Sequence, residues 1–298
     1  MPDRESPFLR VIIFLMIIGL TNLPKVPRVL GVSSPEVYLS SPDIPQGDLV
    51  LVRVKGEKGL PPRVTWLNKE IYLISNRDKT DWYGFLAADL KAKPGTYPLT
   101  IETRPSSRKK EIEIKITEKQ FGVRRLTLPK NMVDLDAETL KRVQQESSEM
   151  KKLWKSPFIE PIWEGPFLRP VQGEVVGPFG RSSIINEQQR SPHSGVDLRA
   201  ERGTPVKAMN GGKVVLTGDH FFTGLTVVID HGGGIQTMYF HLDKILVQED
   251  QQVGRGEVLG LVGSTGRATG PHLHLGVRIN GARVDPLELL TVSEQIVE

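Results

Sequence analysis

The sequence predicts a mainly β protein, because short apolar segments separated by turn residues fill most of the chain. Three observations carry this prediction. Residues 37–117 contain six segments with the length and composition of strands, residues beyond 166 form a glycine-rich β region, and one segment between them has helical periodicity. We therefore expect an N-terminal β-sandwich, a linker helix and a second β domain, in that order along the chain.

The composition is that of an ordinary globular protein. The 298 residues leave room for about two domains, and 38% of them are hydrophobic and 25% charged. The formal net charge of +4 is a mild basic excess, which does not indicate a nucleic-acid-binding surface. The chain has no cysteine, so disulfides and thiolate metal sites are excluded.

Residues 1–30 are expected to be an export signal or a membrane anchor. An apolar run at 11–20 follows Arg4 and Arg10. This run of about ten residues is shorter than the ~20 that a membrane-spanning helix needs, and it fits the hydrophobic region of a secretory signal. No Ala-x-Ala cleavage site follows, so an uncleaved anchor through residues 8–20 stays open as the alternative. In either case we expect the rest of the chain to work outside the cytoplasm, in the periplasm, the cell envelope or the extracellular space.

Residues 31–121 are expected to form the β-sandwich, with the strand number of an immunoglobulin-like domain. Valines at every second position within 50–54 share one face. Isoleucines within 112–116 alternate with charged residues, as in a sheet with one solvated face. The expected strands are 37–40, 49–55, 64–74, 82–90, 97–103 and 111–117.

Three aromatic residues of this region allow two interpretations. Trp66, Trp82 and Tyr83 could form a platform for a ligand, or they could fill the core of the sandwich. The core interpretation is favoured, because nothing else in residues 31–121 suggests catalytic chemistry.

Residues 122–165 are expected to link the two domains through one helix. Asp136 is suited to cap the helix N-terminus, and Glu138 follows in the first turn, where the helix dipole favours an acidic residue. Three prolines between 157 and 166 then exclude regular structure, so we expect the second domain to span 166–298. One apolar stripe of the helix consists of Leu140, Val143, Met150, Leu153 and Trp154.

The second domain contains glycine-separated strands and one pair of histidines on a strand. The glycine triplet 232–234 fits a hairpin loop between strands 227–229 and 237–239. The segment 263–270 lacks the Gly-Lys-Ser/Thr ending of a phosphate loop, which disfavours nucleotide binding. Within strand 270–276, His272 and His274 share one face while leucines occupy the other.

The six histidines all lie beyond residue 192, which favours a metal site. On an extended segment residues i and i+4 share a face, so His193 and Asp197 can converge. One imidazole from the 272/274 pair would complete two nitrogens and one carboxylate oxygen. That set suits a zinc ion with three protein ligands and an open fourth position, and spacing alone does not choose between His272 and His274.

A zinc ion in such a site would acidify a bound water, so hydrolysis is the expected reaction. His241 and the histidine left over from the pair would then move protons or stabilise the oxyanion. His220 and His231 adjoin glycines in expected turns, and we expect structural roles for both.

The pattern as a whole resembles one known family. His193-x-x-x-Asp197, His241-Leu242 and the Gly-Ser-Thr-Gly segment that leads into His272-Leu273-His274 are similar to the signature of the lysostaphin-type, LytM-like zinc metallopeptidases. The resemblance implies that His193, Asp197 and His274 bind one zinc ion per chain, with His241 and His272 as unliganded catalytic histidines. It covers about residues 167–291 and includes, in the family's order, the segments 203–206, 253–256 and 284–286.

The resemblance also implies a fold and a substrate. The family has a mainly antiparallel β-sheet crossed by a groove, and it hydrolyses peptide bonds in peptidoglycan stem peptides or cross-bridges. We therefore expect an exported monomeric zinc endopeptidase whose partner is peptidoglycan and not nucleic acid. The alternative from another class is a non-catalytic cell-wall-binding protein or an activator of other wall hydrolases.

Overall fold

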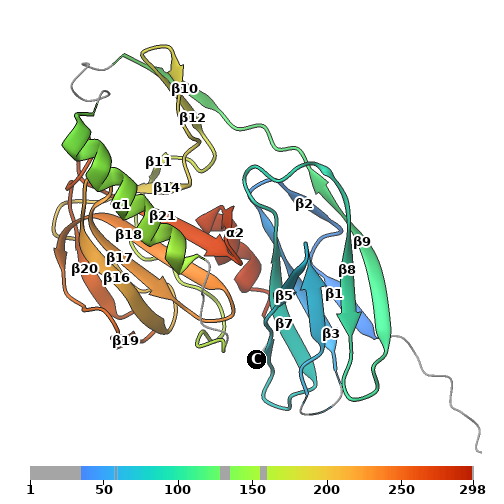
Figure 1. Cartoon of the computed structure of the whole chain (residues 1–298). Coiled ribbons are helices and arrows are strands. Elements are labelled where there is room, and N and C mark those ends of the chain that lie inside the picture. Colours follow the sequence, from blue (N-terminus) through green and yellow to red (C-terminus); the bar gives the residue numbers. More distant parts are fainter. Residues whose placement is uncertain (1–34, 57, 59, 128–134, 155–159, 297–298) are drawn as a thin grey trace, which may run out of the picture. The chain divides into compact units, whose positions relative to one another are not determined.

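The computed structural model describes residues 35–56, 58, 60–127, 135–154 and 160–296. These residues form strands throughout and two helices, α1 (Ala137–Leu153) and α2 (Pro286–Ser293), so the mainly β prediction is confirmed (Figure 1). The expected export signal or anchor lies outside the described residues. In the part of the chain that is described, no helix combines the length and apolarity needed to cross a membrane. The division at residues 30, 121 and 165 stays a prediction.

Two sheets formed by residues 36–117 make up the N-terminal part. One edge strand of the second sheet, β2 (Asp43–Pro45), pairs in parallel with β9 (Lys109–Thr117). All other pairs in these two sheets are antiparallel. The first sheet has the order β1 (Glu36–Leu39), β3 (Leu49–Lys55), β7 (Asp81–Ala87), β6 (Ile74–Ser75); the second has β2 (Asp43–Pro45), β9 (Lys109–Thr117), β8 (Gly95–Glu102), β4 (Arg63–Trp66), β5 (Lys69–Ile71).

The inward residues of both sheets form one buried cluster, as their alternation predicts. Val52 and Val54 of β3 and Ile114 of β9 are fully buried in it. The expected single strand 64–74 is wrong, because Leu67 and Asn68 have positive φ angles of 48° and 62° and turn the chain between β4 and β5. Two consecutive left-handed residues are the requirement of a tight hairpin turn.

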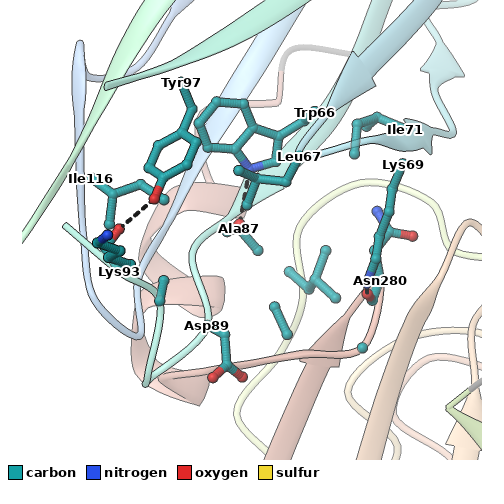
Figure 2. A pocket seen from close by; sticks show the side chains of 14 residues that line it. Trp66, Leu67, Lys69, Ile71, Ala87, Asp89, Lys93, Tyr97, Ile116 and Asn280 are labelled. Atoms are coloured by element: carbon teal, nitrogen blue, oxygen red, sulfur yellow. Dashed lines mark hydrogen bonds between the residues drawn. The ribbon is translucent and has the colours of Figure 1, made fainter. Parts of the chain in front are cut away.

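The three aromatic residues with two interpretations are buried: Trp66, Trp82 and Tyr83 are 2%, 7% and 3% exposed. Trp66 donates its indole N–H to the Ala87 carbonyl at 2.9 Å. Trp66 also borders a cavity of about 310 Å³ whose other walls include Tyr97 and Asn280 (Figure 2). The core interpretation therefore accounts for these rings.

Helix α1 begins as the sequence predicts. Asp136 is the N-cap, and its carboxylate accepts the Thr139 N–H. Met150, Leu153 and Trp154 pack against buried residues of the large sheet, whereas Leu140 is 45% exposed. The predicted stripe is thus wrong at its N-terminal end, because only the last turns of the helix reach an apolar surface.

The large sheet contains ten strands, and its described pairings are antiparallel. The triplet 232–234, all with positive φ, forms the predicted hairpin loop between β17 and β18. The main path is β11 (Val175–Gly177), β14 (Gly195–Arg199), β21 (His272–Ile279), β18 (Ile235–Ile245), β17 (Gly224–Asp230), β16 (Gly212–His220), β19 (Gln252–Val253), with β15 (Pro205–Lys207), β20 (Val258–Val262) and β22 (Ala282–Val284) attached.

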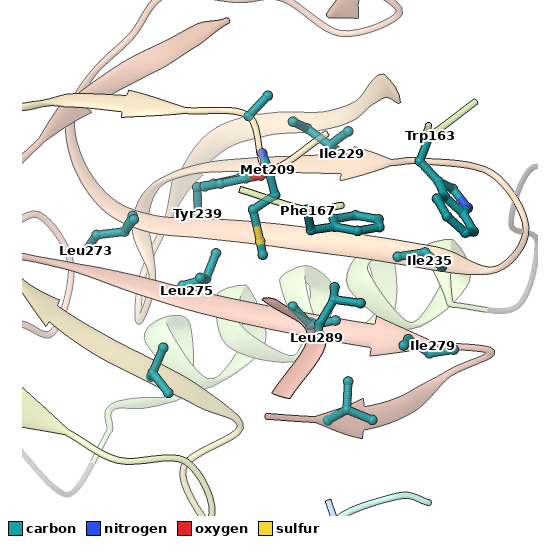
Figure 3. Close-up of a cluster of buried hydrophobic side chains, with 14 of the residues drawn as sticks. Trp163, Phe167, Met209, Ile229, Ile235, Tyr239, Leu273, Leu275, Ile279 and Leu289 are labelled. Carbon is teal, nitrogen blue, oxygen red and sulfur yellow. Dashed lines mark hydrogen bonds between the residues drawn. The ribbon is translucent and has the colours of Figure 1, made fainter. Parts of the chain in front are cut away.

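One face of the large sheet is covered by an apolar core (Figure 3). Leu273 and Leu275 of β21 are fully buried there, together with Tyr239 of β18 and Leu289 of α2. Because side chains alternate along a strand, burying both leucines turns His272 and His274 to the opposite face. The core thereby fixes which face of the sheet carries the histidines.

A small sheet and an ion pair add long-range contacts within the compact unit Ser34–Glu298. The strand β10 (Val123–Leu126) pairs in parallel with β12 (Ser182–Ile185), which also pairs with β13 (Gln188–Gln189). Arg283 of β22 donates to the carboxylate of Asp89. The β10–β12 pairing links the segment after β9 to the region that precedes His193, and the ion pair links β22 to the segment after β7.

Candidate metal centre

Two adjacent strands and one preceding loop position the site. Strands β14 and β21 pair with Asp197 directly opposite His274. His193 lies two residues before β14, where its N–H donates to the Arg181 carbonyl at 3.0 Å and its carbonyl accepts the Gly180 N–H at 2.8 Å. His274 is therefore brought to residues 77 and 81 positions away in sequence by ladder hydrogen bonds and one loop.

The donor cluster, which consists of His193, Asp197 and His274, is compact. His193 Nε2 lies 3.0 Å from His274 Nδ1 and 3.0 Å from Asp197 Oδ1. His274 Nδ1 lies 2.9 Å from the same carboxylate oxygen. Among the described residues, these three form the cluster of histidine and carboxylate side chains that could hold a metal ion.

The donor cluster fits a zinc ion by donor type and by spacing. Two imidazole nitrogens and one carboxylate oxygen are common ligands of catalytic zinc, with bonds of about 2.0–2.2 Å and therefore tetrahedral edges of roughly 3.3–3.6 Å. The observed separations are a few tenths of an ångström shorter, which small ring rotations can accommodate. No fourth protein donor closes the set among the described residues, so an open coordination position would remain.

The tautomers of three histidines follow from their backbone partners. A carbonyl can only accept, so the Nδ1 atoms of His193, His241 and His272 carry protons that they donate to Pro178, Thr265 and Gly270. A ring with this tautomer presents a lone pair at Nε2 when it is neutral. In His193 that atom faces Asp197 and His274.

Two further imidazoles stand beside the donor cluster. The ring centroids of His241 and His272 are 4.8 Å apart, and His241 lies 6.1 Å from His274. His272 Nε2 is 3.8 Å from Asp197 Oδ1, which is beyond hydrogen-bonding distance. The structure thus brings all five predicted site residues onto one face.

His241 reaches that face through a β-bulge. Leu225 and Val227 of β17 pair with Leu242 and Tyr239 of β18, so β18 has one residue more than its partner over this stretch. His241 has a φ of 62°, a left-handed conformation that is strained for a residue with a side chain. Without the bulge, alternation would place His241 on the face of the sheet opposite Phe240. With the bulge, the side chains of Phe240 and His241 lie on the same face. The Phe240 ring stacks on His274 with ring centroids 5.2 Å apart, and His241 faces His272.

The electrostatics of the site favour an ionised carboxylate and neutral imidazoles. Burial raises the pKa of Asp197, but hydrogen bonds and attraction from His193 and His274 outweigh it and bring that pKa well below its usual range. Burial lowers the pKa of His241 to about 4, although its hydrogen bond to the Thr265 carbonyl acts in the opposite direction. Burial also lowers the pKa of His274. These are the protonation states that metal ligands and a proton acceptor require.

Two glycines make room for the donor cluster because they have no side chain. A Cβ atom at Gly177 would lie 2.0 Å from an Asp197 carboxylate oxygen, and one at Gly195 would lie 2.7 Å from His274 Nε2. Sequence reasoning did not single out these positions, because a glycine in a glycine-rich β region carries no signal of its own.

The remaining two histidines lie apart from the donor cluster. His231 is fully buried, and its ring nitrogens contact the Gly211 carbonyl at 2.7 Å and Thr237 Oγ1 at 2.8 Å. His220, expected in a turn, is instead the last residue of β16, with Nε2 3.8 Å from Glu149. These contacts agree with the structural roles expected for both.

A β-sheet that presents two imidazoles and a carboxylate, with two more imidazoles beside them, is typical of mononuclear metal-dependent hydrolases. Comparison with known proteins narrows this class. Residues 191–286 match the model of peptidase family M23. A Pseudomonas aeruginosa protein described as an M23 peptidase is similar in structure, with a TM-score of 0.66 and 35% identity over 83% of this chain and 95% of that one. The chain belongs to peptidase family M23.

Curated relatives share a shorter stretch. The peptidoglycan DD-endopeptidase ShyA of Vibrio cholerae is 46% identical over 98 residues, which are 33% of this chain and 23% of ShyA. The DD-carboxypeptidase/endopeptidase Mpg of Neisseria meningitidis is 42% identical over 129 residues, which are 43% of this chain and 30% of Mpg. The chain thus spans about a quarter to a third of the length of these relatives.

Proposed function

We propose that the protein is an exported zinc-dependent endopeptidase that hydrolyses peptide bonds of peptidoglycan. The observation that carries the proposal is the donor cluster with two unliganded imidazoles on the same sheet face. Membership of a peptidase family and the relative ShyA, which is named as a peptidoglycan DD-endopeptidase, support the same substrate class. The apolar run at 11–20 supports export.

His193, Asp197 and His274 would hold the zinc ion, which when bound supplies a water acidic enough to ionise near neutral pH and a Lewis acid for the carbonyl. Ionised Asp197 would offset part of the metal charge. Its Oδ1 lies 2.9–3.0 Å from the nitrogens of His193 and His274 that would share the ion with it. Phe240, stacked on His274, excludes water from that side of the ring.

His241 and His272 would handle protons and charge at the scissile peptide bond. Both rings are fixed through Nδ1–H donation to carbonyls, so Nε2 is the atom that each presents. Neutral His241, with its pKa lowered to about 4, can accept a proton from the attacking water and pass it to the leaving amine. His272 would stabilise the oxyanion by donating a hydrogen bond from Nε2 after that atom has taken up a proton.

The test uses the purified full chain, loaded with one equivalent of zinc, and isolated peptidoglycan. We expect new amino termini in the digest, identified by mass spectrometry, and their loss after chelation and recovery on adding zinc. The His272→Ala variant should keep zinc and lose cleavage. Absence of any cleaved peptide from the zinc-loaded protein would contradict the proposal and favour a non-catalytic wall-binding or activator protein.

A further inference from the structure

Helix α1 contacts the turn that joins β16 to β17. The Phe221 N–H donates to both carboxylate oxygens of Glu146, at 3.1 and 3.0 Å. Arg142, one helical turn earlier, donates to the same carboxylate at 2.7 Å and to the Asp219 carbonyl at 2.8 Å. The helix therefore contacts the backbone at Phe221, the first residue of the turn 221–223, and at Asp219 of β16, two positions earlier.

The same turn supports the backbone of His241. The Thr223 carbonyl accepts the His241 N–H at 2.8 Å. This bond is made by the residue with the strained left-handed conformation, which persists only where its surroundings hold it. A displacement of the turn would therefore be transmitted directly to the bulge that turns His241 toward His272.

The turn also touches the loop that orients the His241 ring. The Phe222 carbonyl accepts the Arg267 N–H at 3.0 Å. A Cβ atom at Gly224 would lie 2.3 Å from Thr265 Oγ1, so this residue and the loop are in close contact. The Thr265 carbonyl accepts the Nδ1–H of His241 at 2.8 Å. Both the backbone and the ring of His241 thus depend on groups that the turn contacts.

The contact between Glu146 and the turn is local and specific. No residue of α1 is buried, and the apolar packing of the helix is confined to Met150, Leu153 and the adjoining Trp154. Glu146 is an exception among the polar side chains, because it is only 18% exposed. The helix also lies outside residues 191–286, the stretch that matches the family model (Figure 1).

We propose that Glu146 is a positioning residue, which fixes the 221–223 turn and, through this turn, the position of His241. Helix α1 is then required for full catalytic activity. This inference rests on the proposed function. If α1 only covered the sheet, weakening the contact between Glu146 and the turn would leave the rate of cleavage unchanged or increase it.

The experiment compares three variants of the zinc-loaded full chain. Glu146→Ala removes both contacts, Glu146→Gln keeps an oxygen for the Phe221 N–H, and Gln145→Ala alters an exposed residue of the same helix as the control. We expect Glu146→Ala to lower kcat for peptidoglycan peptides roughly 10- to 100-fold with little change in KM or zinc content. Glu146→Gln should recover most of this loss, and Gln145→Ala should match the wild type.

Hydrogen exchange supplies a readout that does not depend on activity. Amides in residues 219–225 and 239–243 should exchange faster in Glu146→Ala, with and without zinc, while the unfolding temperature stays close to that of the wild type. Unchanged exchange at 239–243, an unchanged kcat, or a higher kcat would each overturn the proposal. A wild-type protein that cleaves nothing would contradict the proposed function, and exchange at 239–243 would still decide whether Glu146 controls His241.

Discussion

Strand β9 of the N-terminal sheets alternates regularly, whereas strand β18 of the ten-stranded sheet departs from alternation. In strand β9, isoleucines at every second position face the core, and charged residues stand between them. In β18, by contrast, the bulge at His241 turns two successive side chains to one face, and Gln236, Thr237 and His241 are buried polar residues. Regular alternation gives β9 one buried and one solvated face, whereas His241 of β18 reaches the candidate site because alternation is broken there.

The two regions also differ in what holds their polar groups. In the N-terminal region, the buried Asp48 forms an ion pair with Lys119 at 2.6 Å, and neither residue belongs to the candidate metal centre. In the large sheet, Asp197 contacts two imidazoles from different elements, which is a poor arrangement for stability alone and a good one for a cation. Substitutions in the large sheet should therefore affect zinc binding, whereas substitutions in the N-terminal sheets should affect only stability.

The largest effect is expected from the donor cluster. His274→Ala should abolish stoichiometric zinc binding and lower cleavage by more than roughly 100-fold, because a direct ligand matters at least as much as the groups around it. His272→Ala is the matched control on the same strand face and should lower cleavage while the zinc content stays at one per chain. Metal analysis and peptide mass spectrometry give both values; equal zinc contents in the two variants would contradict the assigned roles.

Truncating a buried side chain in each of the two regions should have different effects on zinc binding. Ile114 and Leu275 are both fully buried, so an alanine at either position should cost about 2–5 kcal/mol of unfolding free energy. Only Leu275 adjoins His274 on β21, so only Leu275→Ala should also weaken zinc binding. Urea unfolding and zinc titration measure the two quantities, and weaker zinc binding by Ile114→Ala would show that the comparison is wrong.

A pH effect on stability is expected from the large sheet. Burial lowers the pKa of His231 to about 4, below its value of about 6.5 in an unfolded chain. The unfolded state therefore takes up a proton first as the pH falls, and up to about 3 kcal/mol of stability should be lost between pH 6.5 and 4. His231→Gln should show a flatter pH dependence in urea unfolding; the same slope as the wild type would exclude His231 as the cause.

The smallest effect is expected at the N-cap of α1. Asp136→Ala removes the acceptor of the Thr139 N–H, so the first turn of the helix should exchange faster. Cleavage should change little, because Glu146 lies more than two turns further along. A large loss of kcat in this variant would mean that the whole helix, and not the Glu146 contact, controls the turn.

Much of the site follows from local rules. The spacing of His193 and Asp197 on an extended segment predicts their convergence, and the alternation in β21 predicts that His272 and His274 share a face. The choice of His274 as the residue nearest Asp197 does not follow, because it depends on the register between β14 and β21, whose residues are separated by more than 70 positions. Similarity to a known family supplied that choice where spacing did not.

Other features depend on tertiary contacts that no local pattern encodes. The bulge at His241 sets one residue of β17 against two of β18, and no pattern in residues 238–242 predicts it. Helix α1 was expected as a linker from its caps and its stripe, yet the contact between Glu146 and Phe221 joins residues 75 positions apart. The sequence thus predicted the donors and the strands, and the structure was needed for the partners that orient them.

Gly177 and Gly195 bear on how far such a centre can be moved to another protein. Neither has a functional group, yet any side chain at either position would collide with Asp197 or His274. In a systematic substitution scan they should tolerate replacement as poorly as the ligands themselves. Grafting the site onto a different sheet would therefore require copying two vacancies along with three donors.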